Sequence, residues 1–173
     1  RGLTIATGTA ATVQFGGVVG GTYALGAIQI TGTNAALDLN AAITSATSLS
    51  VSGASDLGAN VTTSGTQTYT GATTLSTDVT LTTTNNNVTF GSTVNSDGAT
   101  ARDLTLSMGT GTVQFGGVVG GTYALDVISI TGALDLNAAI TSAASLSVSG
   151  ASDLGANVTT SGTQTYTGAT TLS

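Results

Sequence analysis

The sequence lacks most of the residues on which enzyme chemistry depends. Its 173 residues include no cysteine, histidine, tryptophan or proline, and its only basic side chains are two arginines. All eight acidic residues are aspartates. Lysine, histidine and cysteine supply most general bases and nucleophiles, so the composition predicts a chain that is not an enzyme. We expect no catalytic residue, no cofactor and no bound metal.

Charge is scarce, and most of it is negative. Charged residues make up 6% of the chain and the formal net charge is −6. Two arginines cannot neutralise a phosphate backbone, so we expect no nucleic-acid partner and no attraction to an anionic membrane surface. No apolar run reaches the roughly 18 residues that a membrane-spanning helix needs. We therefore expect no membrane insertion.

The residues that are abundant favour a folded β-structure. The chain is 40% hydrophobic, and its mean hydropathy of +0.36 is far above that of disordered chains. Its bulky apolar residues are leucine, valine and isoleucine, accompanied by many threonines, serines and alanines and by 25 glycines. Small and β-branched side chains favour strands over helices. The composition predicts an all-β fold.

A long internal repeat divides the chain. The segment from Thr12 to Leu25 recurs letter for letter from Thr112 to Leu125, and the segment from Ser48 to Ser76 recurs from Ser145 to Ser173. The first repeat therefore occupies residues 1–101 and a truncated second repeat occupies residues 102–173. Because the sequence stops inside its own repeat, we expect it to be a piece of a longer array. Within that piece, residues 1–173 are predicted to form one continuous domain.

A shorter period lies inside the long repeat. Short runs with an apolar residue at every second position recur at spacings near twenty residues, and about five of them fill one long repeat. These runs begin at Leu3, Ile28, Leu49, Gln67, Val88, Leu104, Ile128, Leu146 and Gln164. Further runs, such as Val13-Gln14-Phe15, lie between them, joined by turn-forming glycine, asparagine, serine and aspartate. Strands and turns that alternate with this period indicate the coils of a solenoid.

Stacking would give these short strands the hydrogen-bond partners that they lack alone. We predict a right-handed parallel β-helix with coils of about 20 residues, eight or nine coils in all, and a rod about 40 Å long at a coil spacing of about 4.8 Å. Alternation places Leu49 and Val51 inside and Ser50 outside. The orientation of Tyr69 and Tyr166 is ambiguous, and we expect both inside the coil or at its corner.

Three polar or glycine-rich motifs have structural explanations. The segment Gly16–Gly21, repeated at 116–121, lacks the order of a phosphate-binding loop and predicts a tight turn or close coil packing. Asp38 and Asp135 each stand alone where calcium needs several carboxylates, so we expect turn residues or outward-facing residues. The run Asn85–Asn87 is predicted to close a turn.

Several threonine-rich runs resemble a known group of bacterial proteins. The runs Val61–Gly71, Val79–Thr82 and Val88–Val94 resemble the repeat region of filamentous-haemagglutinin-type surface proteins and the passenger domains of large autotransporter adhesins. The resemblance implies secretion of an unfolded chain across a Gram-negative outer membrane, followed by folding into a rod at the cell surface.

These observations predict a structural shaft fragment of a large secreted surface protein or adhesin, which displays a distal module and contributes to adhesion or biofilm. The expected partners are neighbouring repeats of the same protein. The exposed ends predict end-to-end self-association, and the sequence identifies no receptor. A self-assembling extracellular fibre or sheath subunit is the alternative. Ice binding by the threonine tracts Thr66–Thr70, Thr80–Thr82 and Thr163–Thr167 is disfavoured, because coils with Gln29–Thr31 and Ser50–Ser52 intervene.

Overall fold

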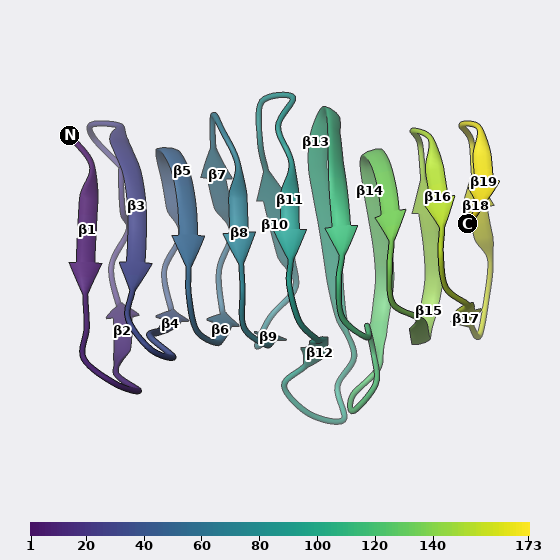
Figure 1. Cartoon of the computed structure of the whole chain (residues 1–173), viewed down its shortest axis with the longest axis horizontal. Helices are drawn as coiled ribbons and strands as arrows, with labels where there is room; N and C mark the ends of the chain where they lie inside the picture. Colours follow the sequence, from purple (N-terminus) through teal and green to yellow (C-terminus); the bar gives the residue numbers. More distant parts are fainter.

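The chain folds into a rod of stacked parallel strands. A computed structural model describes residues 1–173, with nineteen strands and no helix. The coils average about 21 residues and make about eight turns. In Figure 1 the near strands run downward while the chain advances from left to right, so the coil is right-handed. The predicted all-β parallel β-helix is confirmed, with coils close to the expected length.

Three sheet faces make up each coil, and the first is named face A. Its strands lie nearest the viewer in Figure 1. Face A contains β1 (Leu3–Ala6), β3 (Leu25–Thr31), the second half of β5 (Ile43–Val51), β8 (Gln67–Tyr69), β11 (Val88–Phe90), the second halves of β13 (Arg102–Phe115) and β14 (Leu125–Leu136), β16 (Ser152–Leu154) and β19 (Thr170–Leu172). Each strand pairs in parallel with the strand one coil before it.

Face B lies along the bottom of the rod in Figure 1. It contains β2 (Thr12–Phe15), β4 (Ala36–Leu39), β6 (Ser55–Leu57), β9 (Thr73–Leu75), β12 (Val94–Ser96), the single bridge residue Val119, the start of β15 (Ile140–Val148) and β17 (Val158–Thr160). The five strands from β2 to β12 form a separate sheet. Short strands suffice here because their backbone groups pair with those of the neighbouring coils.

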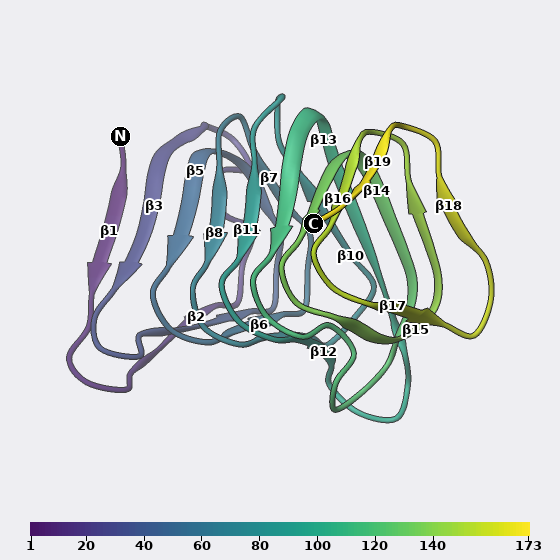
Figure 2. The ribbon, with the colours of Figure 1, turned by 45° about the vertical axis from the view of Figure 1, so that its right-hand side comes forward.

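Face C lies at the back of the rod. It contains the start of β5, then β7 (Val61–Thr63), β10 (Val79–Thr82), the first halves of β13 and β14, the end of β15, and β18 (Gln164–Tyr166). Figure 2 shows the coils obliquely, with the loops that follow β12 and β13 projecting below them.

A single apolar core fills the rod. It contains 33 buried residues that run from Ile28 to Val148 without a break. The predicted alternation is confirmed: Leu49, Val51, Leu146 and Val148 are all at most 1% exposed, whereas Ser50 lies on the outer surface. Burial of valine and leucine on every face is the main stabilising term of the coil.

Three aromatic residues, Tyr69, Phe90 and Phe115, stack in the middle of the rod. Tyr69 is fully buried, so its predicted inward orientation is confirmed. Its ring lies 5.3 Å from that of Phe90, and Phe90 lies 5.3 Å from Phe115, with interplanar angles of 15° and 8°. Tyr166 also points inward but stays half-buried, because it lies in the last coil and no further coil covers it.

The two sequence repeats do not lie on the same faces. Leu3–Ile5 begins the first coil on face A, but its counterpart Leu104–Leu106 lies on face C, paired with Val79–Leu81. Between these two positions the chain passes through fourteen strand segments, counting Val19 as one. Three segments form a coil, so the repeat contains four coils and two segments. Each repeat is therefore rotated by a third of a turn relative to full register.

The repeat length of four and two-thirds coils is close to the expected five, but the rotation places the nine runs in two columns and not in one. The first five runs lie on face A, whereas those at Leu104, Ile128, Leu146 and Gln164 lie on face C. Phe90 pairs with Phe115, the counterpart of Phe15, and not with Leu106. The spacing of the runs identified the strands correctly, but spacing alone does not determine how many strand segments make up one coil.

Candidate functional site

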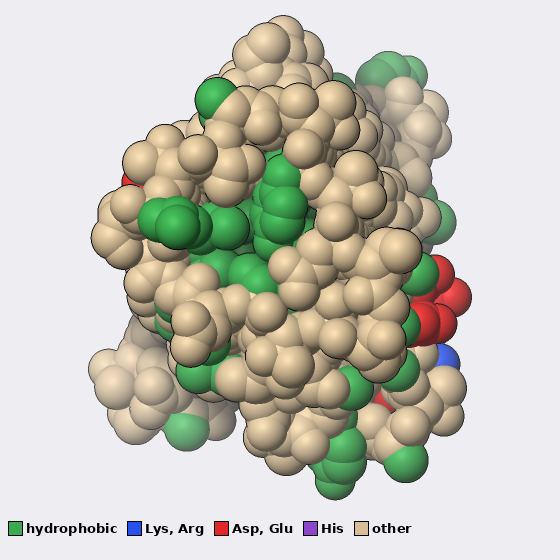
Figure 3. Space-filling model, turned by 90° about the vertical axis from the view of Figure 1, so that its right-hand side faces the viewer, with side chains coloured by type: hydrophobic (Ala, Val, Ile, Leu, Met, Phe, Trp, Pro, Cys, Tyr) green, Lys and Arg blue, Asp and Glu red, His purple; other side chains and the backbone are tan.

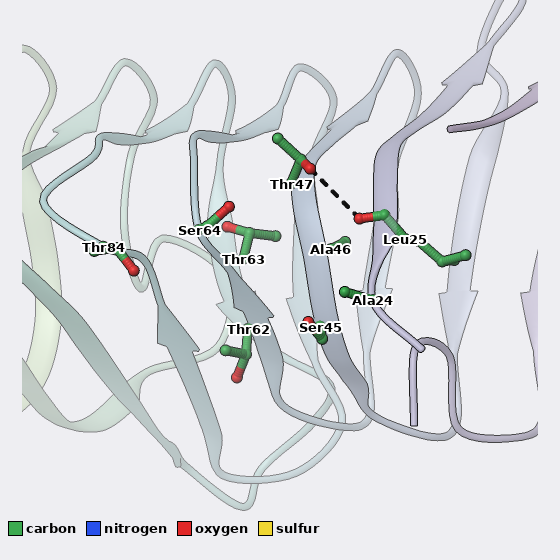
Figure 4. A pocket seen from close by; sticks show the side chains of 9 residues that line it. All are labelled: Ala24, Leu25, Ser45, Ala46, Thr47, Thr62, Thr63, Ser64 and Thr84. Carbon is green, nitrogen blue, oxygen red and sulfur yellow. Dashed lines mark hydrogen bonds between the residues drawn. The ribbon is translucent and has the colours of Figure 1, made fainter. Parts of the chain in front are cut away.

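One groove recurs in both sequence repeats. The first copy, with a volume of about 320 Å³, runs along the corner between faces C and A and is shown in Figure 4; it is lined by Ala24, Leu25, Ser45, Ala46, Thr47, Thr62, Thr63, Ser64 and Thr84. The second copy, of about 350 Å³, is lined by the equivalent residues Ala124, Leu125, Ser142–Ala144 and Thr159–Ser161, together with Ala101. Because the repeat is rotated, the second groove faces another side of the rod.

The groove is lined by hydroxyl and methyl groups. Neighbouring coils each contribute one short segment, and Thr47 Oγ1 donates a hydrogen bond to the carbonyl oxygen of Leu25 in the preceding coil, at 3.4 Å. Thr63 Oγ1 donates to the carbonyl oxygen of Gly65 at 2.7 Å. No lining residue is titratable, so the groove offers hydrogen bonding and van der Waals contact but no acid–base chemistry.

The predicted outward orientation of Asp38 and Asp135 is confirmed. Asp38 lies in β4 on face B, where its carboxylate accepts hydrogen bonds at 2.8 Å from Gln14 Nε2 and from Asn40 Nδ2. Asp135 lies on face A and accepts from Gln114 Nε2, also at 2.8 Å. These amide donors in the same or the preceding coil stabilise the charged carboxylates.

Each of these aspartates is stacked on a second aspartate in the next coil. Asp38 pairs with Asp56 on face B, and Asp135 pairs with Asp153 on face A. Like charges directly opposite each other on a sheet are destabilising. Ser76 Oγ donates a hydrogen bond to Asp56. No group of three or more potential metal-ligating His, Cys, Asp or Glu side chains gathers anywhere on the chain.

The glycine-rich segments form the predicted close contacts. Gly20 and Gly120 have φ angles of 75° and 70°. A Cβ atom at Gly20 would lie 2.2 Å from the carbonyl oxygen of Ser45, and one at Gly120 would lie 2.0 Å from that of Ser142. Only glycine fits such a left-handed turn against the next coil. The turn predicted at Asn85–Asn87 is also present, with Asn85 at a φ angle of 55°.

A buried polar network around Gln67 could not be recognised from the sequence. Gln67 is fully buried, and its Nε2 donates to the carbonyl oxygens of Thr82 at 2.9 Å and Val61 at 3.3 Å. Its Oε1 accepts a hydrogen bond from the Tyr69 hydroxyl at 3.0 Å. Burial strongly raises the pKa of Tyr69, so the phenol stays neutral and donates. Tyr166 and Gln164 repeat this bond at 3.1 Å, where partial burial raises the pKa of Tyr166.

No helix of the chain is long and apolar enough to span a bilayer. In comparisons with known proteins, no family model, curated protein or solved structure matches the chain.

Proposed function

We propose that the chain is a length of structural shaft from a large protein secreted to the outer surface of a Gram-negative cell. The observation that carries this proposal is the continuity of the core across the boundary between the two sequence repeats. Val79–Thr82 of the first repeat pairs with Leu104–Ser107 of the second without a register shift. Repeats that join in this way build a rod of any length.

Axial hydrogen bonding supports a load-bearing role. Nearly every coil is bonded to the next on all three faces, and 102 backbone hydrogen bonds hold the chain together. Most contacts link neighbouring coils, so the rod resists bending while its surface carries few charged groups. The resemblance to adhesin repeat regions favours display of a distal module, with adhesion or biofilm formation as its role.

Deleting one complete repeat provides a direct test of the shaft. Removal of residues 1–101 from the full protein should shorten the rod by about 22 Å, since fourteen segments make four coils and two-thirds of another at about 4.8 Å each. It should also rotate everything beyond the deletion by a third of a turn. Electron microscopy should show slender rods outside the cell that are shorter after the deletion, and an antibody against residues 102–111, which have no identical copy in the chain, should label them. Label confined to the cytosol would contradict the proposal.

Assembly as an extracellular fibre is the second candidate, favoured by the exposed ends of the coil. Figure 3 looks onto the C-terminal end, where apolar side chains lie uncovered in the middle of the coil. Leu172 is 81% exposed, whereas its counterpart Leu75 is fully buried beneath the next coil. Leu3 and Ile5 are partly exposed at the other end, but their counterparts Leu104 and Leu106 are fully buried.

We therefore expect the 173-residue polypeptide to associate end to end. Unpaired strand edges and exposed apolar cross-sections favour stacking of one chain on another, in a head-to-tail contact that does not close. Salt should strengthen the association, because it screens the net charge of −6. Light scattering over a range of protein and salt concentrations measures this. A species that stays monomeric at high protein and high salt would show that the ends do not attract each other.

A further inference from the structure

Face C carries an unbroken array of hydroxyl side chains over five consecutive coils. We call it the hydroxyl face. Each coil contributes two outward residues, separated by one inward residue. The ten residues are Thr80 and Thr82, Thr105 and Ser107, Ser129 and Thr131, Ser147 and Ser149, and Thr165 and Thr167.

The hydroxyls stand in two rows along the rod. Parallel pairing aligns Thr80, Thr105, Ser129, Ser147 and Thr165 one above the other. The second row begins with the paired residues Thr82, Ser107 and Thr131, and Ser149 and Thr167 continue it. Neighbours lie about 4.8 Å apart along the rod and about 6.6 Å apart along a strand. The result is a regular two-dimensional lattice.

The core holds this lattice rigid. The residues that alternate with the hydroxyls on four of these coils are Val79, Leu81, Leu104, Leu106, Ile128, Ile130, Leu146 and Val148, and each is at most 2% exposed. No bulge interrupts the pairing between Leu104–Ser107 and Ile128–Thr131 at the centre of the face. Six of the ten side chains are threonines, whose χ1 angle is restricted by branching at Cβ. Little side-chain freedom remains to be lost on binding.

The hydroxyls are free to bond outside the protein. Only Ser149 Oγ takes part in an intramolecular side-chain hydrogen bond, accepting from the backbone nitrogen of Gly132 at 3.3 Å. Each hydroxyl can donate one hydrogen bond and accept two. The two rows themselves contain no charged residue. Asp78 and Asp103 lie at the edge of face C, two residues before Thr80 and Thr105, and their carboxylates accept hydrogen bonds from backbone nitrogens of the next coil, those of Asp103 at 3.0 Å and Val127 at 2.9 Å.

The strand register places no interrupting segment within the two hydroxyl rows of face C. Gln29–Thr31 and Ser50–Ser52 were expected to interrupt the threonine tracts, but both lie on face A. The tract at Thr66–Thr70 lies on face A as well. Face C alone combines the tract at Thr80–Thr82 with the tract at Thr163–Thr167, with only serine and threonine between them in the two rows.

We propose that the hydroxyl face binds the surface of ice. The surface of crystalline water presents donors and acceptors at fixed repeating positions, and a rigid array of groups that both donate and accept can bond to many of them together. Individual hydrogen bonds to water contribute little net free energy, so binding depends on the number that form at once. A charged side chain would hold its own hydration shell and disrupt this order. The function is additional to a shaft role and does not depend on it.

Matched variants from the two sequence repeats provide the test. Thr131 lies on the hydroxyl face, and its counterpart Thr31 is exposed on face A within the same Ile-Thr-Gly sequence. Thermal hysteresis and the shape of growing ice crystals are measured for the 173-residue chain, for Thr131→Tyr and for Thr31→Tyr. We expect hysteresis and faceted crystals from the unmodified chain, loss of both effects in Thr131→Tyr, and retention of both in Thr31→Tyr.

A second pair guards against a variant that fails to fold. Ser147→Tyr should abolish the effect and Ser50→Tyr should preserve it, because identical Leu-Ser-Val sequences place these serines on faces C and A. Circular dichroism confirms the fold of each variant before the ice measurement. Absence of hysteresis from the unmodified chain would overturn the proposal. Equal loss in the face A and face C variants of a folded pair would overturn it as well.

Discussion

Val51→Asp should destabilise the rod by about 4 kcal/mol or more, because it places an unpaired charge in the apolar core. Val51 is fully buried and lies between Ile30 of the preceding coil and Tyr69 of the next. The only basic side chains, Arg1 and Arg102, are not buried, so neither lies in the core to pair with the new carboxylate. The measurement is urea-induced unfolding followed by circular dichroism, compared as a change in midpoint and slope.

The neighbouring outward residue provides the control. Ser50→Asp should change stability by no more than about 0.5 kcal/mol, because the side chain points to solvent between Gln29 and Thr68. The second sequence repeat supplies an independent pair, with Leu146→Asp strongly destabilising and Ser147→Asp nearly neutral. If the inward and outward variants of either pair lost equal stability, the assignment of inside and outside would be wrong.

The strands and their inward residues could be predicted from the sequence because alternation with a period of two is a local property. Leu49, Ser50 and Val51 show this alternation within three residues. Turn residues were equally local: Asn85 and Gly120 adopt left-handed backbone conformations that few other residue types tolerate. The repeated segments then indicated stacking, since identical short strands can be buried only against one another.

The face on which each strand lies could not be predicted, because it depends on a count over the whole coil. Leu49–Val51 and Leu146–Val148 have the same sequence but lie on faces A and C. Loop lengths vary along the chain, so the spacing of runs does not distinguish two segments per coil from three. Placing all the runs on one face hides the hydroxyl face, because its ten residues come together only when each strand is assigned to the face on which it lies.

The candidate groove and the Gln67 network escaped sequence analysis for a related reason. The groove around Ser45 and Thr62 is assembled from residues about twenty positions apart, none of which is unusual alone. Gln67 is a polar residue at an inward position, and polar residues are mostly exposed. Its burial depends on Thr82 and Val61, whose carbonyl oxygens satisfy its amide. Such compensation appears only when neighbouring coils are placed together.

Tyr69→Ala should cost about 3–5 kcal/mol, the range for removing a fully buried aromatic side chain. The substitution removes one end of the stack with Phe90 and Phe115. It also leaves Gln67 Oε1 without its donor, a buried acceptor that is costly to leave unpaired. The same stack bridges the two sequence repeats, because Tyr69 belongs to the first and Phe115 to the second. Unfolding should therefore become less cooperative between the two halves of the rod.

Tyr166→Ala is the matched variant, since Gln164-Thr165-Tyr166 repeats Gln67-Thr68-Tyr69 and keeps the same tyrosine–glutamine hydrogen bond. Its ring is half-buried and stacks on no other ring, so we expect a loss of about 1 kcal/mol. Urea unfolding of both variants measures the difference. A large loss from Tyr69→Ala with a small one from Tyr166→Ala would assign the stabilisation to stacking within the rod. Equal losses would assign it to the local strand sequence, and coil stacking would then contribute little at this position.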